Sequence, residues 1–575
     1  MTTASAHAAL AEVIRIRNDT GAQDPVPGAG VRCRTALADA IRRWLTELWH
    51  TTGAPGRGVA LACSGSLARQ ETGPRSDLDL IVLHEPRMPA KEVARIAELL
   101  WYPIWDSAIA LDHSVRSLKQ CRQIASGDLN VAGAMLDLSP IAGDTDLVRR
   151  AAKQLGEDWR ANARTRLPEL LAHIEERHER FGELAQMLEP DLKEAKGGLR
   201  DMSVLRAMTA SWLADRPHGA VDEAHTFLLD VRDTLQRVTG RQRSVLTQHD
   251  QAEVGQRLGF DDPDDLLSRL GTAARRLSTA TAETLRRAGQ SQRGRLARRG
   301  PRRPELVPLH PGLYAHDGEL VLGPIRGGST EDHVLLPWRA AAVSSIQDLP
   351  LSPVTARKLV EWPAPDTPWP EKARSLFVDI LRGPGLLHTW NSLDLGGVID
   401  LWLPEWVAIR DRPQHNPLHR HTVDRHSLEA VLEATRLVDR VSRPDLLLVG
   451  ALLHDLGKRP NVADHSAEGA RIVRPIVERM GWSPADRRLL ELLVAEHLTL
   501  MALATGRDPA DPATAHRLAG VIGHDPCTLR LLAALTEADA RSAGPRAWST
   551  VRSSLMKDLV ARTAAHLDRP ARSAG

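Results

Sequence analysis

Two groups of acidic and imidazole side chains, far apart in the chain, have the composition of metal sites. The first group contains Asp77 and Asp79, in the segment SDLDLIVL. Because alternate residues of a strand face the same side, both carboxylates would point to one place. Two such carboxylates suit a divalent cation whose remaining coordination positions are filled by phosphate oxygens and water. We expect this pair to be catalytic and to bind Mg²⁺ or Mn²⁺, although a D-x-D alone is also compatible with a solvated strand end.

A glycine-serine turn precedes the two carboxylates. Gly65 and Ser66 form this turn, and Arg69 and Glu71 follow within the same short span. Backbone N–H groups and a hydroxyl in such a turn can hold phosphate oxygens. We therefore expect Gly65, Ser66, Arg69 and Glu71 to bind a nucleotide.

The second group lies beyond residue 420 and contains histidine and aspartate only. A single histidine on an apolar helix face is more often a packed core residue than a ligand, but a longer ordered set favours a metal site. Such ligands suit Fe, Mn, Zn or a similar ion, and water at an open position would become nucleophilic. We expect His454 and Asp455 to be catalytic. The expected metal ligands of this group are His426, His454, Asp455, His465, His497 and Asp539.

The first group needs strands to position it, and the second needs helices. The apolar run at residues 59–62 and the alternation at residues 76–83 predict two strands. Leu428, Val431 and Leu432 follow His426 at helical spacing, and an apolar helix is predicted to end at His454 and Asp455. All six ligands of the second group except His465 lie in segments with a helical pattern.

Both groups resemble known enzyme superfamilies. The segment GSLARQE…SDLDL resembles nucleotidyltransferases of the DNA polymerase beta type, in which a third carboxylate on a later strand helps to hold two metals. This resemblance implies that Asp106, in the strand-like segment LWYPIWDSAIALDHSVRS, is that catalytic third carboxylate. The order His, His-Asp, His, His, Asp resembles the His-Asp (HD) phosphohydrolases, including their two-metal members.

A wider resemblance covers residues 30–560. The segments WDSAIALDHSVRS, IAGD, LEPDLKEAKGGLRDM, LGGVIDLWLPEW and HRHTVDRHSLEAV are similar to the bacterial family of PII uridylyltransferase and uridylyl-removing enzymes. The resemblance implies a bifunctional regulator of nitrogen assimilation. Such an enzyme transfers UMP from UTP to a tyrosine of a PII signal protein of the GlnB or GlnK type, and then removes it by hydrolysis. It also implies that Arg200 and Asp201, in KGGLRD, bind the nucleotide.

The implied fold is a multidomain α+β protein. It would contain a polymerase beta-like nucleotidyltransferase core with a helical bundle, followed by an all-α HD phosphohydrolase domain. The length of 575 residues agrees with several domains. We expect an N-terminal helical segment at 1–52, the core at 53–145, the bundle at 146–288, an Arg-rich linker at 289–304, a connecting region at 305–410 and the HD domain at 411–575.

Composition limits the partners. The 75 Lys and Arg residues balance 73 Asp and Glu residues, which argues against a nucleic-acid substrate. The four cysteines are scattered, so neither a disulfide framework nor a zinc site made of cysteines is expected. No apolar stretch has the length of a membrane span and the N-terminus lacks a signal-peptide pattern, so we expect a cytoplasmic protein without a membrane partner.

Two departures from the resembled family affect the expectations. Its full-length members continue into two ACT modules that sense glutamine, whereas this chain ends after the HD segment, so glutamine control is in doubt. Asp112 stands where that family usually has glycine, and it would add a charge near the proposed metals.

Three alternative functions remain open. Metal and triphosphate contacts do not identify the base, so a PII adenylyltransferase that uses ATP is one alternative. A tRNA CCA-adding enzyme is another, but it would need a basic RNA track and a G-G-x-V-R-D signature close to the D-x-D. A non-catalytic PII-binding regulator with relic sites is the third, and such a protein should not retain stoichiometric metal.

Overall fold

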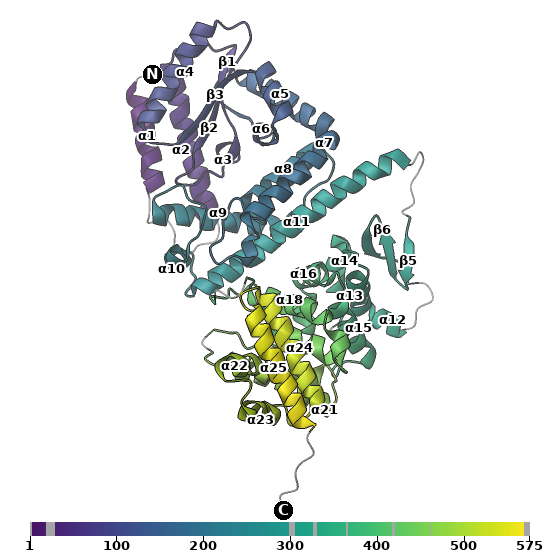
Figure 1. The fold of residues 1–575 in the computed structure, drawn as a ribbon. Helices are drawn as coiled ribbons and strands as arrows, with labels where there is room; N and C mark the ends of the chain where they lie inside the picture. The colour runs from purple at the N-terminus through teal and green to yellow at the C-terminus, as the bar shows by residue number, and fades with distance from the viewer. Residues whose placement is uncertain are drawn as a thin grey trace, which may run out of the picture. The chain divides into compact units, whose positions relative to one another are not determined.

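The computed structural model describes residues 3–18, 29–297, 305–325, 330–363, 366–416, 420–460 and 462–568. The chain divides into two compact units, residues 1–299 and 300–575 (Figure 1). Each unit contains one of the two predicted groups of side chains. The units are described separately.

The first unit is built on a sheet of four strands in the order β3-β2-β1-β4. Strand β1 is antiparallel to both of its neighbours, and β2 is parallel to β3. Parallel neighbours need a crossover connection, which helix α4 (Ala90–Asp106) supplies. The strands are β1 (Val59–Cys63), β2 (Leu78–His84), β3 (Leu111–Ser117) and β4 (Ser139–Gly143).

Apolar residues on both faces of the sheet explain why helices cover it on two sides. Leu80 and Val82 of β2 pack in one cluster with α2 and α4. Ile81 and Leu83, which alternate with them, pack in a second cluster with α5, α6 and α7. Figure 1 shows α2 and α4 on one side of the sheet and α5, α6 and α7 on the other. The bounds are α1 (Thr3–Asn18), α2 (Ala29–Thr51), α3 (Gly65–Ala68), α5 (Leu118–Gly127), α6 (Leu129–Met135) and α7 (Thr145–Phe181).

A helical part completes the first unit and packs around its own apolar cluster. It consists of the 3-10 helix η1 (Leu184–Gln186) and helices α8 (Leu199–Ser211), α9 (Ala220–Thr239), α10 (Gln248–Arg257) and α11 (Pro263–Ala297). The linker expected at residues 289–304 is wrong for its first part, because α11 continues to Ala297. Gln, Arg, Leu and Ala in this stretch are good helix formers, and they outweigh the glycines that suggested a break. Residues 298–304 lie outside the described residues.

The second unit begins with a three-stranded antiparallel sheet and continues in helices. The strands are β5 (Val307–His310), β6 (Leu313–His316) and β7 (Glu319–Leu322). The segment HDGE forms the turn between β6 and β7, since His316 pairs with Glu319. The next helices are α12 (Thr330–Val334), α13 (Leu336–Ile346), α14 (Pro353–Leu359), α15 (Glu371–Arg382), α16 (Leu386–Leu395), α17 (Val398–Trp402) and η2 (Pro404–Ala408).

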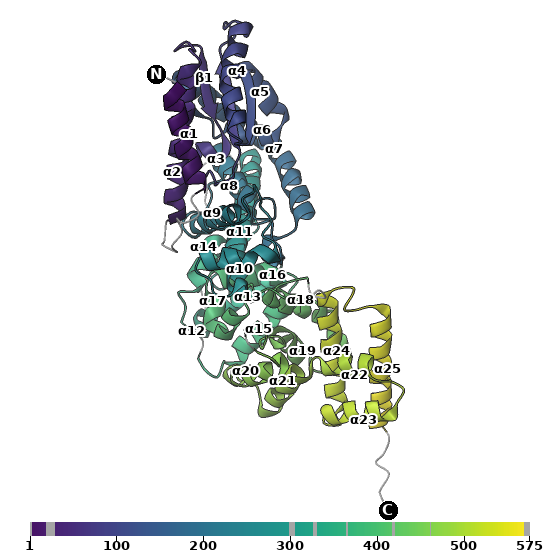
Figure 2. The same cartoon turned by 90° about the vertical axis from the view of Figure 1, so that its left-hand side faces the viewer.

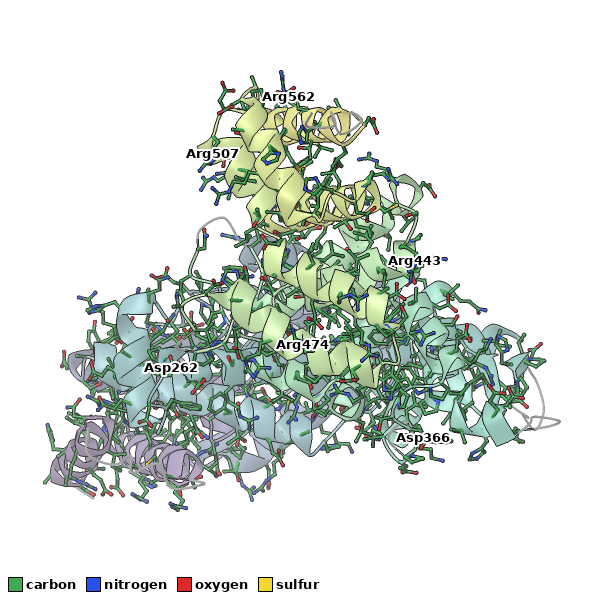
Figure 3. The ribbon with its side chains drawn as sticks, turned by 90° about the horizontal axis from the view of Figure 1, so that it is seen from below. Asp262, Asp366, Arg443, Arg474, Arg507 and Arg562 are labelled. Atoms are coloured by element: carbon green, nitrogen blue, oxygen red, sulfur yellow. The ribbon has the colours of Figure 1, made fainter. Side chains whose placement is uncertain are left out.

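The C-terminal helices hold the second group of predicted ligands. Helix α19 is buried from Leu446 to Leu453, so it forms the centre of this helical part. Arg474 of α20 donates to Glu491 of α21 at 3.0 Å, and it is labelled in Figure 3. Figure 2 shows α22 to α25 grouped together. The bounds are α18 (Val423–Thr435), η3 (Val438–Arg440), α19 (Pro444–Leu453), α20 (His465–Arg479), α21 (Pro484–Glu496), α22 (Thr499–Gly506), α23 (Pro512–Val521), α24 (Pro526–Ala543) and α25 (Thr550–Leu567).

None of the described helices alone has both the length and the apolar composition to cross a bilayer. One pair, Pro484–Glu496 with Thr499–Gly506, passes when taken together, with a bend of 41° between its members.

Candidate active sites

The first site is formed where strands β2 and β3 begin. Asp79 and Asp112 are each the second residue of their strand, and they pair directly in the parallel register. Asp77 immediately precedes β2. Burial, followed by the negative charges of Asp77 and Asp112, raises the pKa of Asp79 to about 6. Three carboxylates that repel one another in this way form an oxygen donor set suited to Mg²⁺ or Mn²⁺.

The strand expected at Asp106 is wrong. Asp106 is the exposed last residue of helix α4. Ile96, Leu100 and Ile104 are all buried and recur every four residues, which is the period of a helix. The alternation after Asp106 belongs instead to β3, so the carboxylate that lies beside Asp79 is Asp112.

The turn at Ser64 and Gly65 lies directly against Asp79. The backbone N–H of Ser64 donates to the carbonyl oxygen of Asp79 at 3.0 Å. Gly65 has φ +60°, and a Cβ there would lie 2.4 Å from Asp79 Oδ2. Only glycine therefore permits this approach of the turn to the carboxylate.

A cavity of about 1070 Å³ opens beside the three carboxylates. Its size suits a nucleoside triphosphate. It is lined by several residues expected from the sequence, namely Gly65, Ser66, Arg69, Glu71, Asp77, Asp79 and Arg200. Several arginines that sequence reasoning did not assign to the site also line it, among them Arg116, Arg180, Arg206 and Arg232, and Lys193 lines it as well.

Glu71 lies at the cavity wall, but its carboxylate is occupied by arginines. Arg69 Nε donates to Glu71 Oε2 at 2.8 Å and Arg206 Nη1 donates at 3.2 Å. Arg232 Nη2 donates to the Glu71 carbonyl oxygen at 2.7 Å. Burial alone would raise the pKa of Glu71, but the hydrogen bond from Arg206 and the neighbouring positive charges lower it to about 2. Because Arg206 belongs to α8 and Arg232 to α9, Glu71 fastens these helices to the sheet.

Arg200 and Asp201 point in different directions. Arg200 lines the cavity and donates to Glu194 Oε1 at 3.3 Å. Asp201 is fully buried and accepts the Gly197 N–H at 2.7 Å and hydrogen bonds from Arg177 and His178. Consecutive residues of a helix face about 100° apart, so only one of the two can reach the cavity. Asp201 is therefore not placed to contact a nucleotide, as the resemblance had implied. It holds the KGGLRD turn in shape through the hydrogen bond from Gly197.

In the second unit, the six predicted ligands meet in one cluster, in which His426, His454, Asp455 and His497 are buried and His465 and Asp539 are partly exposed. His426 Nε2 lies 2.9 Å from Asp539 Oδ1 and 3.5 Å from Asp455 Oδ2. His497 Nε2 lies 3.7 Å from Asp455 Oδ1. Two groups of side chains have ligand atoms close enough to hold an ion, and both groups include Asp455. They are His426-His454-Asp455 and Asp455-His465-His497.

The histidine rings are oriented by backbone carbonyls. His454 Nδ1 lies 2.8 Å from the Ala451 oxygen, and His497 Nδ1 lies 2.7 Å from the Val494 oxygen. An Nδ1–H that donates to a carbonyl leaves Nε2 unprotonated and free to bind a metal. His465 Nε2 and Asp455 Oδ1 are buried and have no hydrogen-bond partner among the described residues. Buried polar atoms without partners are costly, so these atoms fit a cation.

The charges of the cluster also fit a cation. Burial alone would lower the pKa of His454, but Asp455 and Asp539 raise it to about 10. Burial and the nearby His454 charge lower the pKa of His497 to about 4. The carboxylates thus attract positive charge strongly. Lys458, which the sequence analysis did not consider, lies 2.7 Å from Asp455 Oδ2; its spacing of three residues from Asp455 is the signal that could have found it.

The expectation that His465 lies outside a helix is wrong. His465 is the first residue of α20, and Asp464 caps this helix by accepting the Ala467 N–H at 3.0 Å. The cap explains why a segment with little apolar pattern, ADHSAEGA, still begins a helix. His454 and His497 each stand directly after a helix, and Asp539 lies within α24.

Family models match part of each of the two units. A family model described as HD domain matches residues 423–540, and one described as GlnD PII-uridylyltransferase matches residues 165–210 and 203–285. The HD match and the two ligand groups indicate divalent-metal binding in the second unit.

Curated relatives match most of the chain, and each of the following is named a bifunctional uridylyltransferase/uridylyl-removing enzyme. The relative from Streptomyces coelicolor is 44% identical, over 92% of this chain and 64% of its own length. The relative from Mycobacterium tuberculosis is 40% identical, over 92% of this chain and 67% of its own length. The relative from Corynebacterium glutamicum is 36% identical, over 86% of this chain and 70% of its own length.

Proposed function

Because the chain belongs to the family of bifunctional uridylyltransferase/uridylyl-removing enzymes, we propose that it attaches a uridylyl group to a PII signal protein and also removes it. The observation that carries this proposal is that two chemically different metal-competent sites occur in one chain, one in each compact unit. Oxygen ligands beside a triphosphate-sized cavity suit nucleotidyl transfer, and a mixed imidazole and carboxylate cluster suits hydrolysis. The proposal places the protein in the cytoplasm, where UTP is available.

In the transfer reaction, Asp77, Asp79 and Asp112 would hold Mg²⁺ or Mn²⁺. Bound cations neutralise triphosphate charge and polarise the α-phosphate. The Gly65-Ser66 turn offers backbone N–H groups to the phosphates, and the cavity wall positions the nucleotide. The tyrosine oxygen of the acceptor forms a bond to the α-phosphorus. The bond from that phosphorus to the bridging oxygen breaks, pyrophosphate leaves with the electron pair, and the hydroxyl proton passes to the medium.

In the removal reaction, the two ligand groups that share Asp455 would hold two divalent ions, one in each group. Such ions activate water and polarise a phosphodiester. Ala451 and Val494 hold the rings of His454 and His497 in place through their carbonyls. Lys458 brings a positive charge to the same cluster, where the ester phosphate would bind. Water cleaves the ester to tyrosine and UMP, so this reaction is not the reverse of the transfer.

The base of the donor nucleotide is the part of the proposal for which a second candidate exists. The metal and phosphate contacts described here are the same for UTP and ATP, so a PII adenylyltransferase is the second candidate. The names of the relatives favour UTP. A tRNA CCA-adding enzyme is disfavoured because the GGLRD turn supports the cavity through the buried Asp201, far along the chain from Asp77 and Asp79.

The test is intact mass spectrometry of a PII protein from the same organism. The protein is incubated with Mg²⁺ or Mn²⁺ and with UTP or ATP in parallel. We expect a uridylyl increment, which disappears after the nucleotide is removed from the mixture. An adenylyl increment would show that the donor is ATP and not UTP. The absence of an increment with either nucleotide would contradict the proposal.

Reciprocal variants test whether the two sites are independent. The double substitution Asp77→Asn and Asp79→Asn should abolish transfer but spare removal. The substitution Asp539→Asn should spare transfer but stop removal. Loss of both activities in either variant would show that the sites do not work separately.

A further inference from the structure

Lys193 lies at the cavity of the first unit, between η1 and α8. It lines the cavity together with Asp77, Asp79 and Asp112, and it is exposed. Lys193 thus brings a positive charge to the cavity that the metal carboxylates also line.

The backbone of Lys193 is fixed on both sides. Its N–H donates to Asp191 Oδ1 at 2.8 Å, and its carbonyl accepts the Arg200 N–H at 3.0 Å. Leu192, immediately before it, is completely buried. A side chain that begins from so rigid a backbone loses little further freedom when it binds a ligand.

The glycine pair after Lys193 explains why this loop holds its shape. Gly197 has φ +85°, and a Cβ there would lie 2.4 Å from the Ala274 oxygen of α11. The buried Asp201 accepts the Gly197 N–H. The loop is therefore pressed against α11 and tied to the start of α8, and the KGGLRD signature serves to present Lys193.

The neighbouring basic residues of the loop have carboxylate partners, as do two arginines of the cavity wall, whereas Lys193 does not. Arg200 pairs with Glu194 at 3.3 Å, and Lys196 pairs with Glu183 at 3.8 Å. Arg69 and Arg206 are occupied by Glu71. Among the described residues, no carboxylate lies within ion-pair distance of Lys193. Its charge remains available for an anionic ligand.

We propose that Lys193 binds the β- and γ-phosphates of the nucleotide and stabilises pyrophosphate as it leaves. The inference rests on the proposed function, because it assigns the triphosphate of that reaction. As the bond between the α-phosphorus and the bridging oxygen breaks, its electron pair moves to the pyrophosphate, and negative charge grows on the side of the cavity that faces Lys193. A compact ammonium group with three donors suits such an anion.

The substitution Lys193→Met tests this role, with Lys196→Met as the matched control. Lys196 lies in the same loop and has the same charge, but it is paired with Glu183. Loss of a charged hydrogen bond should lower kcat/KM for UTP by about 10- to 100-fold in Lys193→Met. Inhibition of transfer by added pyrophosphate should weaken by a similar factor, which loss of fold alone would not cause selectively. Lys193→Arg should recover part of the activity.

Three outcomes separate this inference from the proposed function. Removal of uridylyl groups by the same preparations should be unchanged, which controls for folding. If wild type transfers and Lys193→Met does so equally well, or if Lys196→Met loses as much, the assignment of Lys193 is wrong and the proposed function stands. If wild type does not transfer, the proposed function fails. Calorimetry of UTP binding in the presence of Mn²⁺ then still tests whether Lys193 binds the phosphates. Equal affinity for UTP in wild type and Lys193→Met would overturn the assignment.

Discussion

Replacing Glu71 by glutamine should loosen the attachment of helices α8 and α9 to the sheet. The substitution keeps the size of the side chain but removes the charge that Arg69 and Arg206 share. Both arginines would then face a neutral amide in a buried place. Breaking a buried charge network in this way is among the most destabilising single changes.

The magnitude follows from the pKa of Glu71. It is about 2, against an ordinary value of 4.5, and each pKa unit corresponds to about 1.4 kcal/mol. The charged carboxylate therefore stabilises the folded state by about 3 kcal/mol at neutral pH. Because the folded-state pKa is lowered, this stabilisation is complete above pH about 4.5 and is lost as pH falls toward about 2.

Hydrogen exchange followed by mass spectrometry measures the effect where it should occur. At pH 7, the free energy of opening of α8 and α9 should fall by about 3 kcal/mol in Glu71→Gln. The control is Glu92→Gln, which removes an exposed ion pair with Arg95 and should leave opening unchanged. Equal protection of α8 and α9 in wild type and Glu71→Gln at pH 7 would refute the reasoning. So would a deficit that does not shrink below pH about 4.5.

Three shorter predictions follow from the same geometry. Gly65→Ala should abolish transfer and spare removal in the mass assay, because the added Cβ would lie 2.4 Å from a carboxylate oxygen of Asp79. The control is Gly53→Ala, which has a similar φ of +64° but open space around it, and it should retain transfer. Metal analysis should find both ions lost in Asp455→Asn and only one lost in His497→Gln, and loss of a single ion from Asp455→Asn would contradict the shared ligand. Asp201→Asn should destabilise the first unit by about 3 kcal/mol and lower its melting midpoint, because it removes the buried carboxylate that pairs with Arg177 and His178. An unchanged midpoint would count against a structural role of Asp201.

Local patterns in the sequence were sufficient where one element carries the chemistry. Asp77 and Asp79 were expected beside a strand, and the structure places them just before and within β2. The prediction failed at Asp106, because the helix spacing of Ile96, Leu100 and Ile104 was overlooked in favour of a short alternation. Short apolar segments are compatible with either element, and only the longer spacing separates them.

Contacts between distant segments could not be read from spacing at all. His426 and Asp539 are 113 residues apart and lie 2.9 Å from each other. Resemblance to a known order of ligands, and not local chemistry, brought them together in the sequence analysis. Lys193 belongs to the segment LEPDLKEAKGGLRDM that carries the resemblance, but its place at the cavity depends on how the loop packs against α11. Such packing is decided by tertiary structure, which no short motif encodes.

The division of the chain into two compact units, each with its own site, has a consequence for control in the cell. When two opposed catalysts belong to one polypeptide, their molar ratio is one to one at every level of expression. In the proposed function, the fraction of PII that carries the nucleotide is then independent of enzyme abundance and depends only on the relative rates of the two sites. A signal that alters the rate at either site resets that fraction, and each full cycle consumes one UTP.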